Sequence, residues 1–319
     1  MIRPKVGVSK CLEFEACRYN AVMISNEFVR HLKDYVDFVP VCPEAEIGLG
    51  TPRPTVVLQT SGADNLELYQ PTTDTVHTEK MIKLADNYIS NNTELDGFIF
   101  KSKSPSCGLK GVKVYHKKSK QAVKASKGLF ALKISEHYDL IAAEEDGRLN
   151  DFQIREHFLI KLYSIARFRE VEKSNNIKML QEFHARHKML FYCYNQNILR
   201  KMGRIASNLE KKDIKLVIKE YAENLALIFS KVLSYKKRIN SLIHMLGYFK
   251  EHITAKQKAH FLESVEDYRN SRISAFAPLA IMQSWTKGYD VPYLENQYIF
   301  EPFPKGIRFV TDSGKGVKR

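Results

Sequence analysis

The first half of the chain contains the stretch Asp96-Gly-Phe-Ile-Phe-Lys-Ser-Lys-Ser-Pro-Ser-Cys-Gly108. Its first five residues predict a buried strand, and the serines, proline and glycine that follow are typical of a loop. Cys107 therefore lies in a loop after a strand, within a segment that is rich in lysine. A thiol in this setting is a candidate reactive centre for an anion.

Two further cysteines occupy comparable positions. Cys11 follows the predicted strand Lys5–Ser9, and Cys42 follows the predicted strand Val36–Val41. In an open α/β sheet, ligands bind outside the carboxyl ends of the strands. We therefore expect Cys11, Cys42 and Cys107 to meet at one edge of the sheet, although they are far apart in the sequence.

Three converging thiolates favour a metal centre. Full ligation of a 4Fe–4S cluster takes four cysteines, so three would leave one iron open to an outside ligand. Zinc with a water as its fourth ligand is the alternative metal, and unrelated buried cysteines are the structural alternative. Cys17 follows closely after Cys11 and is a rival ligand, whereas Cys193 stands among aromatic residues and is expected to pack in a core.

Short β-rich runs alternate with amphipathic segments through residues 1–150. This alternation predicts an α/β domain with a mostly parallel sheet. A polar segment at Glu144–Asp151 sets the predicted domain boundary at residue 150. The other predicted elements of this half are strands or a hairpin at 55–59 and 66–69 and helices at 26–35, 76–91 and 128–136.

Strand patterns nearly disappear after this boundary. Helical periodicity predicts an all-α domain over residues 151–319. Asp213 and Thr254 stand where they can cap two of its helices, and the tail after Phe303 is expected to be loose. The predicted helices cover 152–172, 175–202, 211–233, 235–249 and 254–270.

The net charge of +14 is unevenly distributed. Residues 1–150 carry 20 Lys and Arg against 19 Asp and Glu, whereas residues 151–319 carry 30 against 17. Ten lysines and no acidic residue lie between Lys101 and Lys133. Clustered Lys and Arg favour a polyanion such as nucleic acid through counterion release. The alternative is a basic surface that is only solvated.

The cysteine content and the N-terminal sequence indicate the cellular compartment in which the protein is expected. Five cysteines with irregular spacing do not indicate a disulfide framework. No apolar run approaches the ~18–20 residues of a membrane span, and the N-terminus lacks the apolar core of a secretory signal. We therefore expect a cytoplasmic protein without a membrane partner, with thiols available for metal binding or catalysis.

Characteristic motifs surround the three cysteines and recur in the second half. Around the cysteines they are Ser9-Lys-Cys11 with Cys17-Arg-Tyr19, Val41-Cys-Pro-Glu44 with Gly48-Leu-Gly-Thr-Pro-Arg53, and Lys101-Ser-Lys-Ser-Pro-Ser-Cys-Gly108. Together they resemble the thiouracil desulfidase family over the whole first domain. The second domain resembles a helical domain that is fused to that desulfidase domain in many bacteria, on the motifs His184-Ala-Arg-His-Lys188, Tyr268-Arg269 and Glu301-Pro-Phe-Pro304. Members with this fusion look like tRNA 4-thiouridine desulfidases.

The resemblance implies a hydrolytic reaction in which sulfur leaves a thiolated uracil base as sulfide. It implies catalytic roles for Glu44, as base and proton shuttle, and for Ser102 or Ser104, with Ser102 favoured. Family members usually have glycine near Phe14 and near Ala21, where this chain has larger residues. The implied cofactor is a 4Fe–4S cluster with one iron not bound by cysteine, held by Cys11, Cys42 and Cys107.

The implied partner is tRNA carrying thiouridine. Tyr192, Tyr235 and Tyr248 could stack on its bases or fill helix cores. Rival interpretations are desulfuration of free thiouracil or its nucleosides, and a non-catalytic RNA-binding or redox-sensing iron–sulfur protein. The predicted phosphate contacts are Lys101, Lys103, Lys110, Arg186, Lys188, Lys236, Arg238, Lys250 and Arg269.

Overall fold

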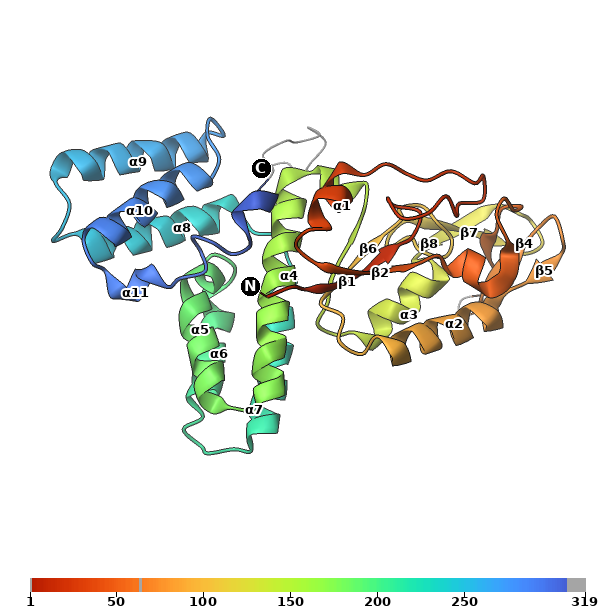
Figure 1. The fold of residues 1–319 in the computed structure, drawn as a ribbon, viewed down its shortest axis with the longest axis horizontal. Helices are drawn as coiled ribbons and strands as arrows, with labels where there is room; N and C mark the ends of the chain where they lie inside the picture. The colour runs from red at the N-terminus through yellow and green to blue at the C-terminus, as the bar shows by residue number, and fades with distance from the viewer. Residues whose placement is uncertain (1, 63–64, 309–319) are drawn as a thin grey trace. The chain divides into compact units, whose positions relative to one another are not determined.

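The computed structural model describes residues 2–62 and 65–308 (Figure 1). These residues form two compact units, the first of residues 2–166 with 307 and 308, and the second of residues 167–306. The division falls within helix α4 (Phe152–Ser174), later in the sequence than residue 150. Of the tail that was expected to be loose, Lys305–Ile307 form a 3-10 turn, η4, and residues 309–319 lie outside the described residues.

The first unit contains a four-stranded sheet in the order β2-β1-β6-β9. Every neighbouring pair in it is parallel, so the carboxyl ends of all four strands lie at one edge. This arrangement confirms the predicted α/β domain with a mostly parallel sheet. The strands are β1 (Lys5–Ser9), β2 (Asp37–Val41), β6 (Gly97–Phe100) and β9 (Ala142–Glu145).

A second sheet has five strands in the order β5-β4-β3-β7-β8. Its strands are β3 (Val57–Thr60), β4 (Leu66–Gln70), β5 (Thr75–Val76), β7 (Val112–His116) and β8 (Ala122–Ser126). Only β3 and β7 pair in parallel, and the β3–β4 hairpin confirms the predicted one. The β7–β8 hairpin was not predicted, because its sequence is part of the lysine-rich segment.

Aromatic side chains fill the core of the first unit. Phe98 and Phe100 on β6 stack with their ring centroids 4.0 Å apart, and Tyr88 meets Phe130 edge-on at 5.5 Å. Gly7 on β1 lies so close that a Cβ there would be 2.3 Å from the Phe98 ring. Besides the first part of α4 and two short turns, η1 (Ala45–Leu49) and η2 (Arg148–Asn150), the helices of this unit are α1 (Glu27–Leu32), α2 (Thr78–Asn91) and α3 (Leu129–His137), and these three lie at predicted places.

The described residues of the second unit contain helices and turns but no strand (Figure 1), which confirms the all-α prediction. Asp213 and Thr254 cap α7 and α9 as predicted. The helices are α5 (Ile177–Tyr192), α6 (Gln196–Ser207), α7 (Ile214–Ile228), α8 (Tyr235–Leu246), the 3-10 turn η3 (Gly247–Phe249), α9 (Ala255–Arg269), α10 (Phe276–Gly288) and α11 (Pro292–Glu295).

The single helix predicted over 175–202 is wrong. The chain forms two helices there because Asn195 begins a new one. Its side-chain oxygen accepts hydrogen bonds from the backbone N–H groups of Asn197 and Ile198 at 3.0 and 3.2 Å. An asparagine cap of this kind satisfies donors that a helix start leaves unpaired.

Across the described residues, no helix combines the length and the apolar content that crossing a lipid bilayer demands.

Candidate active site

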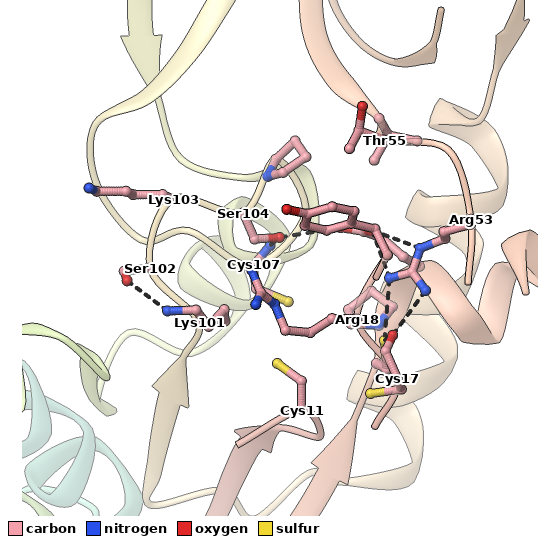
Figure 2. Close-up of a pocket in the computed structure, with 16 residues that line it drawn as sticks. Cys11, Cys17, Arg18, Arg53, Thr55, Lys101, Ser102, Lys103, Ser104 and Cys107 are labelled. Atoms are coloured by element: carbon pink, nitrogen blue, oxygen red, sulfur yellow. Dashed lines mark hydrogen bonds and ion pairs between the residues drawn. The ribbon is translucent and has the colours of Figure 1, made fainter. Parts of the chain in front are cut away.

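The three predicted cysteines line one cavity of about 520 Å³ in the first unit. Cys11 follows β1, Cys42 follows β2, and Cys107 lies in the loop after β6. These strands are neighbours in the parallel sheet, so their carboxyl ends bring the three loops together. Cys17 lines the same cavity, and Figure 2 shows it together with Cys11 and Cys107. Cys193 is buried in the second unit and is not part of this site.

The thiols of this cavity are free and buried. Burial raises the pKa of Cys11 to about 12 and raises the pKa of Cys107 well above its ordinary value. A hydrogen bond with the Cys17 thiol, helped by the charge of Arg53, lowers the pKa of Cys42 to about 7. Cys42 is therefore the thiol most easily ionised near neutral pH. The other two remain protonated unless a cation displaces their protons.

The donor set can be compared with the two predicted kinds of metal centre. In the described part of the chain, no three His, Cys, Asp or Glu side chains are arranged to hold a single metal ion. In an iron–sulfur cluster the cysteines bind different irons and need not converge on one point. Three buried thiols on three loops around one cavity fit such a cluster.

The loop that carries Cys107 is held by close backbone contacts. A Cβ on Gly108 would lie 2.8 Å from the Ser104 carbonyl oxygen, and one on Gly128 would lie 2.5 Å from the Ser106 carbonyl carbon. The Pro105 carbonyl accepts a hydrogen bond from the Leu129 N–H at 3.0 Å, at the start of α3. The loop and α3 therefore fix each other, and both glycines are required by close approach.

The loop that carries Cys11 contains two residues with positive φ. Glu13 has φ +69° and Ala21 has φ +55°, a region that residues other than glycine seldom adopt. The positions lie next to those where family members usually have glycine. Glu13 is held in place by Arg30, whose Nη2 donates to its carboxylate at 3.0 Å. In this chain, residues larger than glycine therefore adopt the positive-φ conformation.

Glu44 is bonded by four donors. Arg53 donates to its Oε2 from Nε at 3.0 Å and from Nη2 at 2.8 Å. The hydroxyl groups of Ser104 and Ser106 donate to its Oε1 at 3.3 and 3.0 Å. The side chains of Glu44 and Arg53 are only 12% and 3% exposed. The carboxylate is thus fixed in orientation beside Cys42, two residues away in the sequence.

Arg53 links this carboxylate to the cysteine loops. Its Nη1 donates to the carbonyl oxygens of Cys17 and Gly50, each at 2.9 Å, and its Nη2 lies 4.0 Å from the Cys42 sulfur. From the sequence, Arg53 in its Thr-Pro-Arg motif could contact either a substrate or a neighbouring acid, and the structure shows the contact with an acid, Glu44. Ser106 is the contact that sequence reasoning missed, since the orientation of this serine does not follow from the motif.

The two predicted catalytic serines have different surroundings. Ser104 contacts Glu44, and its hydroxyl oxygen accepts the Cys107 N–H at 3.0 Å. Ser102 contacts Lys101 instead, whose Nζ lies 3.0 Å from its hydroxyl oxygen (Figure 2) and 2.7 Å from Asp146. Both serines line the cavity. The contacts favour Ser104 rather than Ser102 as the partner of the carboxylate.

The predicted phosphate contacts of the first unit lie on the loop of Cys107. Lys101 and Lys103 line the cavity, and Lys101 is paired with Asp146. Lys110 is exposed, with its backbone N–H bonded to Glu145 at 3.0 Å. Lys103 and Lys110 remain accessible to an anion.

The predicted phosphate contacts of the second unit differ in their exposure and in their pairing with acids. Arg238 is buried at 6% exposure, so its inclusion is wrong, because a phosphate cannot reach it. Lys188 and Lys236 are exposed, and Lys188 lines a second cavity. The other three pair with carboxylates of the same unit at 3.7, 3.4 and 2.7 Å, in the pairs Arg186–Glu182, Lys250–Glu251 and Arg269–Glu266.

Comparisons with known proteins bear on the identity of both units. A family model described as 2-thiouracil desulfurase matches residues 6–146, and one described as Protein of unknown function (DUF1722) matches residues 188–304. The chain is 22% identical over 151 residues to the Escherichia coli (strain K12) protein YbgA, which is described as uncharacterized; the match covers 47% of this chain and 89% of that protein.

A solved structure, the [4Fe-4S]-dependent thiouracil desulfidase TudS, matches with a TM-score of 0.37 and 22% identity over 46% of this chain and 93% of that chain. The match of the desulfurase family model spans all three cysteine loops and the parallel sheet that carries them. Residues 6–146 thus form an enzyme domain of the 2-thiouracil desulfurase family, which this chain joins to a helical domain of a second family.

Proposed function

We propose that the first unit removes sulfur hydrolytically from a thiolated uracil base, giving the oxygen analogue and sulfide. The observation that supports this is one cavity with three buried thiols and a carboxylate that four donors hold. Its volume of about 520 Å³ lies within the ~300–1,000 Å³ of small-molecule sites. A free base or its nucleoside is therefore the substrate that this cavity favours.

The cofactor in this proposal is a 4Fe–4S cluster. Cys11, Cys42 and Cys107 would hold it, and Cys17 in the same cavity is the alternative ligand. When bound, a cluster with one iron free of cysteine supplies a soft acceptor for sulfur and a Lewis acid that polarises the C–S bond.

Glu44 is the proton acceptor in this proposal. Arg53 holds Oε2 with two N–H donors, which leaves Oε1 for exchange of a proton. Of the two hydroxyl contacts to Oε1, that of Ser104 is the longer, at 3.3 Å, and is the one that a water displaces more easily. Glu44 takes a proton as the water oxygen bonds to the thiocarbonyl carbon. The C–S bond then breaks, and both protons of the water leave with sulfur as hydrogen sulfide.

The test uses the whole chain, purified without oxygen and loaded with iron and sulfide. Sulfide release and loss of thiocarbonyl absorbance are measured with 2-thiouracil and 4-thiouridine. Glu44→Gln should lower turnover by ~10²–10⁴-fold while iron content is unchanged, since general-base catalysis contributes about this much. The control is Glu136→Gln, an exposed carboxylate on α3. Near-normal turnover in Glu44→Gln removes Glu44 from the mechanism, and absence of sulfide from every thiolated base overturns the proposal.

A second candidate substrate is thiouridine within tRNA. The charge of residues 151–319, with 30 Lys and Arg against 17 Asp and Glu, supports it. Phosphate contacts from such a region would add affinity for the polyanion and make it dependent on salt. Under this candidate, sulfide release from thiolated tRNA at low salt exceeds that from 4-thiouridine. Equal rates for both substrates favour the free base or nucleoside.

A further inference from the structure

The second unit contains a cavity of about 840 Å³ that its own helices line. Residues of α5 and α6 form most of the wall, and His244 on α8 and Tyr248 on η3 complete it. The volume lies within the ~300–1,000 Å³ typical of small-molecule sites. None of the residues that line it lines the cysteine cavity, so it is a separate binding site.

Three cations line this cavity without an acidic neighbour in its wall. They are Lys188, Arg200 and Arg204, and all three are exposed. Arg200 and Arg204 are four residues apart on α6 and share one face. No ion pair joins any of the three to an acid in residues 2–62 or 65–308. Their positive charge is therefore available to an anion.

Three aromatic rings also line this cavity, those of Tyr192, His244 and Tyr248. Tyr192 stacks on His244 with ring centroids 4.8 Å apart and an interplanar angle of 13°. Tyr248 meets His244 edge-on at 5.9 Å. Tyr192 uses one ring face on His244, and Tyr248 uses one on Tyr293, whose ring centroid lies 5.1 Å away. A planar heterocycle of any base type can stack on the other face of such a ring. Aromatic faces beside unpaired cations match a ligand with a planar ring and a phosphate.

The end of the cavity nearest α7 is neutral. His184 lines it, and its Nδ1 lies 3.0 Å from the Tyr221 hydroxyl oxygen. Burial lowers the pKa of His184 to about 4, so the ring carries no charge at neutral pH. Gly203 keeps this wall open, since a Cβ there would lie 3.3 Å from the His184 Nε2. His184 therefore adds no positive charge to that of the three exposed cations.

We propose that this cavity binds a nucleoside phosphate, with the phosphate on Lys188, Arg200 and Arg204 and the base against the rings of Tyr192, His244 and Tyr248. The ligand is either a free nucleotide or one nucleotide of an RNA chain, because both present the same ring and phosphate. The proposal goes beyond the desulfuration reaction and does not depend on which thiolated base is its substrate.

Calorimetric titration of the whole chain tests this proposal with uridine 5′-monophosphate, uridine and a short oligouridylate. The double variant Arg200→Gln/Arg204→Gln should weaken binding of the monophosphate and the oligonucleotide by roughly tenfold or more, since charge-assisted hydrogen bonds are lost. The matched control is Lys256→Gln/Lys258→Gln, which removes the same charge from exposed positions on α9. Tyr248→Leu, at the rim, should weaken binding less.

The ligands compared in this titration distinguish a free nucleotide from a nucleotide of an RNA chain. Binding of uridine 5′-monophosphate as tight as that of the oligonucleotide supports a free nucleotide. Tighter binding of the oligonucleotide, still lost in the Arg200 and Arg204 variant, supports a nucleotide of RNA. Equal loss in the two double variants overturns the proposal, as does inorganic phosphate binding as tightly as the monophosphate. Absence of binding for both nucleotide ligands at millimolar concentration also overturns it.

Discussion

The two cavities of this chain hold their charges in different ways. In the cysteine cavity the buried charges are paired, Arg53 with Glu44 at 2.8 Å and Lys101 with Asp146 at 2.7 Å. In the helical cavity the exposed cations Arg200 and Arg204 have no described acidic partner. Each arrangement is consistent with its own electrostatic setting, because an unpaired charge is costly only where water cannot reach it.

This difference fits a catalytic role for the cysteine cavity and a ligand-binding role for the helical cavity. Pairing fixes Glu44 in one orientation beside the thiols, as a catalytic group requires before its substrate arrives. Unpaired cations at a surface retain their solvent and their mobility, and a phosphate can replace that solvent at little cost. The comparison therefore predicts large losses from single changes in the first cavity and graded losses in the second unit.

The largest expected effect is loss of the proposed metal centre. Cys107→Ala should lower bound iron and reduce sulfide release to the uncatalysed level, because only two of the three proposed ligands, Cys11 and Cys42, remain. Cys193→Ala, which removes a buried thiol from the second unit, should keep both. Iron analysis and the cluster's visible absorbance check this without reference to turnover. Full iron content in Cys107→Ala would remove this residue from the ligand set and point to Cys17 in its place.

The next effect concerns the buried ion pair. Arg53→Met leaves the Glu44 carboxylate without its guanidinium partner and should cost ~3–5 kcal/mol of folding free energy, as removal of one partner of a buried pair does. Glu210→Gln breaks an exposed pair with Lys212, whose side chains are 76% and 50% exposed, and should cost at most about 1 kcal/mol. Urea unfolding followed by hydrogen exchange in peptides of each unit measures both. Equal costs would contradict the contrast between paired burial and solvated exposure.

The meeting of the cysteines could be predicted because each follows a strand, and neighbouring parallel strands end at one edge. Strand β9, by contrast, could not be predicted from the sequence. Its last two residues, Glu144 and Glu145, belong to the segment Glu144–Asp151 that was predicted as a polar break, yet both glutamates are buried. Glu145 Oε1 accepts the N–H groups of Leu109 and Lys110 at 2.8 and 3.0 Å, and Glu144 pairs with Arg148 at 2.8 Å. A hydrophobicity pattern does not predict that a glutamate is buried when the N–H groups that bind its carboxylate come from another loop.

The same reasoning applies to the site. The motifs contained Glu44 and the serines, but only the folded loops decide that Ser104 and Ser106, rather than Ser102, reach its Oε1. Of the cations that line the helical cavity, Lys188 was predicted as a phosphate contact, whereas Arg200 and Arg204 were not. Arg200 falls in the segment 175–202 that was predicted as one helix, Arg204 lies just beyond it, and the cap at Asn195 starts the separate helix that carries both.

A smaller effect is expected from pH in the second unit. The pKa of His184 falls from an ordinary ~6.5 to about 4 on folding, because of burial. Between these values the unfolded chain binds more protons, so stability is complete above pH ~6.5 and declines as the pH falls toward 4. At pH 4.5 the loss from this residue is about 2–3 kcal/mol. His184→Gln should make the acid-side decline of the urea midpoints shallower, while His187, whose pKa is also lowered by burial, keeps part of that decline. The midpoints are followed by the fluorescence of Trp285, and an unchanged profile would contradict the assignment.

The smallest expected effect is at the start of α9. The Thr254 hydroxyl oxygen accepts the Gln257 N–H at 3.2 Å, and the Gln257 side-chain oxygen accepts the Thr254 N–H at 2.8 Å, which forms a capping box. Thr254→Ala removes one half of it and should cost about 1 kcal/mol, whereas Thr254→Ser keeps the hydroxyl and should cost less. Phe261 on α9 packs against Trp285 at 5.5 Å, so the fluorescence of this tryptophan reports the change. A cost near 1 kcal/mol would be several times smaller than the folding free energy expected to be lost in Arg53→Met. It would show that the solvent exposure of a polar contact, rather than its number of hydrogen bonds, decides how much stability it contributes. A cost as large as that of Arg53→Met would instead show that the helical unit depends on its polar contacts no less than the cysteine cavity does.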